Sequence, residues 1–205
     1  VPERMRCFAL YGLGLAAEAH PFAELQFLVL AGIERSLLPS SKTPTQVRIA
    51  ALHALSLLNL QATPKLSAPV LLLLEQEWSL VVPRQLLSVR AHVPLVAAAA
   101  LRATDAAADA WRHRFVAAMQ NESEHDPVRR SCAQALGRLS GPEHTRVVES
   151  LRSITSAAQD AQTRNLAFFS LGAIAGAENT NWLMSQLQRN SPMAILYEAP
   201  WLAVG

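Results

Sequence analysis

Cysteine, aromatic residues and lysine are all scarce in this sequence. Its 205 residues include two cysteines, Cys7 and Cys132, which are too few for a disulfide framework. Aromatic residues make up only 6% of the chain, whereas 51% of it is hydrophobic and much of that is Ala and Leu. This composition favours close-packed helices with little β-structure. The net charge of +2 is too small to indicate a class of partner by itself.

Long apolar runs and address signals are missing as well. The apolar run 71–74 is far too short to cross a membrane, and no longer run reaches the length of a span. No signal peptide is visible at the start. We therefore expect no membrane span, and the cytoplasm is the default location.

Catalytic and metal-binding motifs are absent too. The sequence has no glycine-rich phosphate loop and no GxSxG, HExxH or CxxC motif. Its six histidines never pair at a spacing of three or four residues, so a zinc site would need them to converge from different parts of the fold. Glu122, Glu124 and Asp126 share one turn, where we expect them to cap the next helix rather than hold a cation. The sequence predicts a protein that is not an enzyme, with no cofactor and no metal site.

What the chain does contain is a repeat. Arginine recurs in one register at positions 6, 48, 90, 129 and 164, with spacings of 42, 42, 39 and 35 residues. Around each arginine, the positions three, six, seven and eight residues later hold small or aliphatic residues in every copy. Positions three and seven lie on one helix face, and small residues at six and eight allow close helix–helix approach. A period of this size indicates stacked helical hairpins.

The segment 126–141, DPVRRSCAQALGRLSG, shows the pattern best and resembles the second helix of a HEAT repeat. The resemblance extends over nearly the whole chain and is carried most closely by Asp126, Pro127, Val128, Arg129, Cys132, Ala135, Leu136 and Gly137. It implies an all-α, right-handed solenoid of about five helical hairpins, which forms a single unit over residues 1–205. Neither end shows a polar capping repeat, so we interpret the chain as a fragment cut within repeats, or as one whose ends pack against something else.

The helical periodicity predicts the individual elements. The expected second helices are 3–16, 45–58, 85–102, 127–139 and 161–175, and Pro94 is expected to kink the third. The expected first helices are 22–37, 65–78, 106–120, 143–157 and 180–190, followed by a final helix that starts at Ser191. The four tryptophans are mostly expected in the cores of first helices.

The two sets of helices differ in charge. The second helices hold nine arginines and one acidic residue, Glu3, whereas the first helices are balanced. The resemblance implies that second helices line a concave face and that the repeated arginine packs between neighbouring repeats, paired with an aspartate such as Asp126 or Asp160. On that reading Arg4, Arg102, Arg130 and Arg138 are left as free basic groups. They leave open a groove that binds nucleic acid or a phosphorylated ligand.

A variable column five residues after each arginine suggests a different partner. It reads Tyr11, His53, Leu95, Gln134 and Phe169. Aromatic and polar side chains of this kind suit protein–protein contacts, although Leu95 and Phe169 could equally pack against first helices. We predict a non-catalytic scaffold that binds a protein partner along the second helices. The candidate partner-binding residues are Tyr11, His53, Arg102, Arg130, Gln134, Arg138 and Phe169. An enzyme that resembles phycobilin lyases or HEAT-like DNA glycosylases would instead need an acidic residue and tryptophans converging on one cavity.

Overall fold

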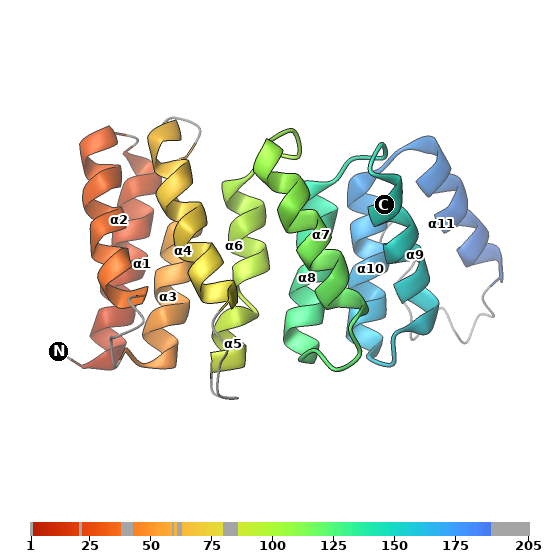
Figure 1. Ribbon diagram of the computed structural model, residues 1–205, viewed down its shortest axis with the longest axis horizontal. Coiled ribbons are helices and arrows are strands. Elements are labelled where there is room, and N and C mark those ends of the chain that lie inside the picture. The colour runs from red at the N-terminus through yellow and green to blue at the C-terminus, as the bar shows by residue number, and fades with distance from the viewer. Residues whose placement is uncertain are drawn as a thin grey trace. The chain divides into compact units, whose positions relative to one another are not determined.

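The structure is a computed structural model in which residues 2–20, 22–37, 43–58, 60, 63–79 and 86–189 are described. The regular secondary structure in these ranges is entirely helical (Figure 1). The chain divides into two compact units, Val1–Ala100 and Leu101–Gly205. We call them the N-terminal unit and the C-terminal unit and describe each by itself.

The N-terminal unit begins with a helical hairpin and continues with shorter helices. Its elements are α1 (Glu3–Ala19), α2 (Ala23–Leu37), α3 (Thr45–Ser56), the 3₁₀ helix η1 (Pro64–Leu66), α4 (Ser67–Ser79), α5 (Leu87–Arg90) and α6 (Val93–Ala100). Helix α3 packs against α1, α2 and α6, while α4 packs against α2 and α6. The helices α1, α3 and α6 therefore form one row of contacts, which we call the second-helix row, and α2 and α4 form the other.

The C-terminal unit repeats this two-row arrangement with helices of 13–15 residues. Its elements are α7 (Ala106–Gln120), α8 (Asp126–Leu139), α9 (Thr145–Ala157), α10 (Ala161–Ile174) and α11 (Ala177–Arg189). Helices α8 and α10 pack against each other and form its second-helix row. Helix α7 packs on α8 and α9, and α10 also contacts α9 and α11.

Most predicted helices agree with the observed ones to within a few residues, and 106–120 agrees at both ends. The largest difference concerns the predicted helix 85–102. It is not one kinked helix, because α5 ends at Arg90 and α6 begins at Val93. Pro94 therefore lies in the first turn of α6, where its missing N–H costs no helical hydrogen bond. The predicted helix from Ser191, with Trp201, lies outside the described residues.

The columns three, six and seven residues after the repeat arginine are buried in four of the five copies. In α8, Cys132, Ala135 and Leu136 are fully buried, and the equivalent residues of α3, α6 and α10 are buried as well. Helix α1 is the exception. Its buried residues are Leu10, Gly14 and Ala17, so the predicted column at Ala9, Gly12 and Leu13 faces solvent.

Two glycines let neighbouring second helices approach closely. A Cβ atom on Gly14 of α1 would lie 3.0 Å from the Ala54 Cα atom on α3. In the C-terminal unit, a Cβ on Gly137 of α8 would lie 2.8 Å from the Ser170 Cα atom on α10. Both glycines stand eight residues after a repeat arginine, and both opposing residues stand six after the next one. The two units thus use the same contact, which supports the repeat alignment.

Candidate binding surface

Three of the repeat arginines connect the two helices of a hairpin by hydrogen bonds. Arg48, Arg129 and Arg164 donate to the backbone carbonyls of Leu37 (3.4 Å), Met119 (3.1 Å) and Ala158 (2.8 Å), respectively. Each carbonyl lies at or just after the C-terminal end of the preceding first helix. Carbonyls at helix ends lack helical partners, and a cation is favourable at the negative end of the helix dipole. These arginines are structural groups, and Arg48 also pairs with Glu77 of α4, outside its own hairpin.

Of the two aspartates predicted to pair with repeat arginines, Asp126 does so and Asp160 does not. Arg129 does lie 3.7 Å from Asp126, but Arg48 pairs with Glu77 of α4 instead of an aspartate. Asp160 forms its ion pair with Arg130, one residue beyond the repeat arginine, rather than with Arg164. The Arg130–Asp160 pair therefore joins the neighbouring second helices α8 and α10. The expectation that Arg130 is a free basic group is wrong.

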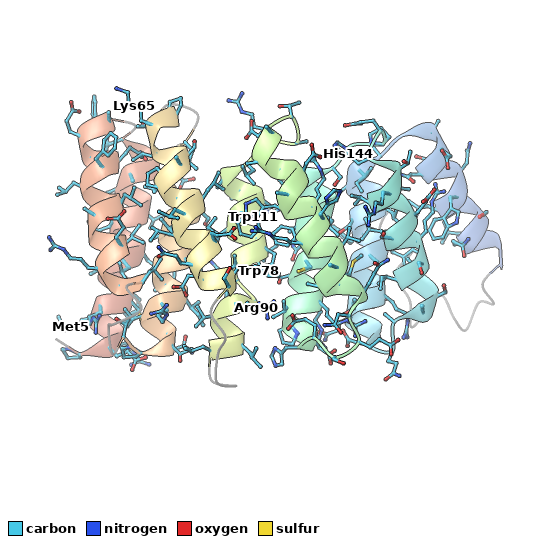
Figure 2. All side chains as sticks on the ribbon, viewed as in Figure 1. Met5, Lys65, Trp78, Arg90, Trp111 and His144 are labelled. Atoms are coloured by element: carbon cyan, nitrogen blue, oxygen red, sulfur yellow. The ribbon has the colours of Figure 1, made fainter. Side chains whose placement is uncertain are left out.

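Arg90, the repeat arginine of the third copy, has a different environment. Its guanidinium carbon lies 4.4 Å from the centre of the Trp78 ring at the end of α4 (Figure 2). This is a cation–π contact. The short helix α5 ends at Arg90, so the chain there lacks the geometry of the other second helices. Trp111 is buried beside Phe115, as expected for a core residue, whereas Trp182 stacks on Phe168 but is partly exposed.

The variable column five residues after the arginine is solvent accessible in all five copies. Tyr11 and Phe169 are 38% and 56% exposed, and His53, Leu95 and Gln134 are partly exposed. In the last four copies the columns three, six and seven residues after the arginine are buried directly beside it. Side chains of this column therefore form the outward edge of the second helices. We call these five residues the outer column.

The structure brings some of the predicted binding residues together and leaves others apart. The rings of Tyr11 and His53 lie 6.1 Å apart, centre to centre, on α1 and α3. Gln134 and Phe169 occupy equivalent positions on the packed helices α8 and α10. Arg138 is exposed in the last turn of α8. Arg102 is exposed beyond the end of α6, where its backbone N–H donates to the Asp105 carboxylate.

His92 joins this surface and was missed by the sequence analysis. It lies in the turn between α5 and α6, and its ring centre is 4.9 Å from that of His53 at an interplanar angle of 67°. Burial lowers the pKa of both histidines below the ordinary value, and for His92 the proximity of His53 adds to the effect. No local spacing could have indicated the pair, because the two residues are 39 positions apart.

On the first-helix side, the C-terminal unit has a cavity of about 180 Å³ between α7 and α9. Its charged lining residues are largely matched. Arg112 donates to the Asp109 carboxylate at 2.6 Å, and the His144 Nδ1 atom lies 3.0 Å from Glu143 (Figure 2 labels His144). The Arg112 guanidinium also donates to the Leu139 carbonyl. These contacts hold Arg112, Asp109 and Glu143 in structural roles, while Arg146 also lines the cavity.

Within the described ranges, no three His, Cys, Asp or Glu side chains are grouped as a metal ion would require. Cys7 and Cys132 are both free thiols in the described structure. None of the described helices has the length and hydrophobicity needed to cross a membrane.

Comparison with protein-family models, with curated proteins and with solved structures found no match. The resemblance to HEAT repeats accordingly depends on the residues and contacts of this chain alone.

Proposed function

We propose that both units are HEAT-like solenoid segments and that the chain is a non-catalytic scaffold, which binds a protein partner along the second helices. Two repeated contacts support the HEAT-like interpretation. The repeat arginine reaches the end of the preceding helix in three hairpins, and the same glycine approach occurs once in each unit. Repeats of this kind expose one edge of every second helix to a partner.

The observation that carries the proposed function is the exposure of the outer column. In the last four copies, this position is partly or fully exposed while the positions three, six and seven residues after the arginine are buried, so the column varies without disturbing the packing. Tyr11 and Phe169 offer exposed aromatic groups, and His53 and Gln134 offer polar ones. Aromatic residues are typical anchors of protein interfaces, and polar groups beside them fix the orientation of a partner.

The environments of the arginines on the second helices give less support to binding of an anionic ligand such as nucleic acid. Arg48 and Arg129 are buried, and Arg130 is held by Asp160. Of the four arginines expected to be free, Arg4 is exposed in the N-terminal unit and Arg102 and Arg138 are exposed in the C-terminal unit. Binding to a phosphate backbone depends on several cations acting together, and aromatic side chains interleaved with cations would be needed to stack bases. The mixture of apolar and polar side chains in the outer column favours a peptide or protein segment.

Selection from a random peptide library displayed on phage tests this proposal directly. Peptides selected on the chain are to be measured by fluorescence anisotropy against the wild type and against Tyr11→Ser and Phe169→Ser. Met184→Ser is the matched control, because it removes an exposed apolar side chain from α11, outside the second-helix row. We expect at least one of the two outer-column variants to weaken binding about tenfold or more, as loss of an interface anchor does. The control is expected to bind like the wild type.

A second experiment measures the binding of labelled single- and double-stranded oligonucleotides across a salt series. Binding that weakens steeply with salt and is lost in an Arg102→Glu/Arg138→Glu variant would favour the anionic-ligand alternative. Selected peptides that bind both outer-column variants as tightly as the wild type would refute the proposed surface.

A further inference from the structure

His53 and His92 form a pair of imidazoles held by two separate parts of the N-terminal unit. His53 projects from α3, which is anchored by fully buried neighbours such as Leu52 and Ala54. His92 lies in the turn between α5 and α6, between the buried Val89 and Val93. Both histidines are themselves partly exposed, so the pair is accessible from solvent. The main chain at each histidine is therefore held in place by its buried neighbours, and its position does not depend on contact between the two rings.

The separation of the two rings fits a shared metal ion. A zinc–nitrogen bond is about 2.0–2.1 Å long, so the ring centre of a bound histidine lies about 3.2 Å from the ion. Two such rings have centres about 4.5 Å apart at a right angle around the ion and about 5.2 Å apart at the tetrahedral angle. The observed separation of 4.9 Å lies between these limits.

The protonation state of the pair also suits a metal. Because burial lowers the pKa of both rings, each is neutral at pH 7 and keeps one ring nitrogen with a lone pair. A neutral imidazole is the form that coordinates metals. Imidazole nitrogen prefers zinc, copper and nickel, whereas magnesium and calcium prefer oxygen ligands.

We propose that His53 and His92 form a two-histidine site for a divalent transition-metal ion of the zinc type. Water fills the remaining coordination positions, because the described residues place no third histidine, cysteine or carboxylate in the group. The site would pin the turn between α5 and α6 to α3. It lies at the outer column beside Tyr11, but ion binding does not depend on the proposed protein partner.

Isothermal titration calorimetry with zinc chloride tests the site on the whole chain. We expect the wild type to bind one zinc ion per chain through both histidines and to show no binding of magnesium. His53→Gln and His92→Gln should each weaken zinc binding at least about tenfold, because even loss of a second-shell partner costs 10–100-fold. His125→Gln, which changes an exposed histidine of the C-terminal unit, should leave zinc affinity unchanged.

A second measurement does not depend on the folding of any variant. In a nitrogen-15 spectrum of the wild-type histidine rings, zinc should shift the signals of two of the six histidines. Absence of zinc binding in the wild type would overturn the proposal. Equal affinity in the folded His53→Gln and His92→Gln variants, or ring shifts confined to other histidines, would do so as well.

Discussion

The guanidinium of Arg130 on α8 binds the carboxylate of Asp160 with two parallel hydrogen bonds, each 2.8 Å long. Asp160 is the residue that caps α10, and the same carboxylate accepts from the backbone N–H of Thr163 at 2.8 Å and from its hydroxyl at 2.6 Å. One side chain therefore both starts α10 and ties it to α8. The hydrogen bonds from Arg130 and Thr163 hold the pKa of Asp160 well below its ordinary value.

Removal of this contact should destabilise the C-terminal unit in a graded way. We expect Asp160→Ala to lower the free energy of unfolding by about 2 kcal/mol, because it removes a helix cap as well as the ion pair. Arg130→Ala should cost about 1 kcal/mol, since it removes the pair alone. Urea denaturation followed by circular dichroism measures both. The control is Arg138→Ala, in the exposed last turn of the same helix, which should change the free energy of unfolding by less than about 0.5 kcal/mol. If Arg130→Ala changes stability no more than Arg138→Ala does, the Arg130–Asp160 pair does not stabilise the unit.

The lowered pKa of Asp160 predicts that the stability of the protein decreases in acid. Its pKa is lowered in the folded state, so its contribution is fully present above the ordinary pKa of an aspartate and is lost as the pH falls through the lower, folded-state pKa. The difference in unfolding free energy between the wild type and Asp160→Asn should therefore shrink below about pH 4. Urea midpoints of both proteins at pH 7 and pH 3 check this. A difference that stays constant over that range would argue against the ion pair.

Gly137 and Gly12 should respond in opposite directions to the same substitution. Gly137→Ala places a methyl group 2.8 Å from the Ser170 backbone, so we expect a loss of about 1–3 kcal/mol from overpacking. Gly12 lies within α1, and apart from the backbone of its own helix nothing would lie within 4 Å of a Cβ atom at this position. Gly12→Ala should therefore leave stability unchanged or raise it by up to about 1 kcal/mol, the difference in helix propensity. Thermal unfolding of both variants tests the pair, and a neutral Gly137→Ala would be inconsistent with the close approach of α8 and α10.

Arg48 and Glu77 form a buried ion pair between α3 and α4, with side chains 5% and 2% exposed. Glu77→Ala leaves the Arg48 charge buried without its carboxylate, and we expect a loss of about 3–5 kcal/mol in the N-terminal unit. Arg48→Met combined with Glu77→Leu replaces both charges by apolar groups and should recover most of that loss. A double variant that is less stable than Glu77→Ala would show that the pair itself, rather than the stranded charge, dominates.

The two histidines predict a loss of stability in mild acid. Their pKa is lowered in the folded state, so the unfolded chain takes up protons first as the pH falls below about 6.5. Stability is therefore present above that pH and falls towards pH 5. Burial raises the pKa of Glu77, which acts in the opposite direction, so the comparison needs a His53→Gln/His92→Gln variant. The wild type should lose more stability than this variant between pH 7.5 and pH 5.5, and parallel curves would show that the rings titrate normally.

Much of the helical structure could be predicted from the sequence, because it depends on local order. Trp111, Phe115 and Met119 recur at intervals of four residues, and all three are buried on α7 at the predicted bounds. The small column of α8 is buried for the same reason, since a helical period places its members on one face. The prediction was wrong where α1 exposes that column and where the helix around Pro94 is interrupted.

The roles of single charged and titratable residues were decided only by tertiary structure. Arg129 and Arg130 are adjacent in sequence, yet one is buried within a hairpin and the other binds Asp160 on the next second helix. His53 and His92 are brought together by the packing of α3 against α5 and α6. Sequence by itself determined which segments are helical and which of their faces are apolar, because both properties repeat over a few residues. Partners thirty or more residues apart depend on how those helices pack, and no local period records that.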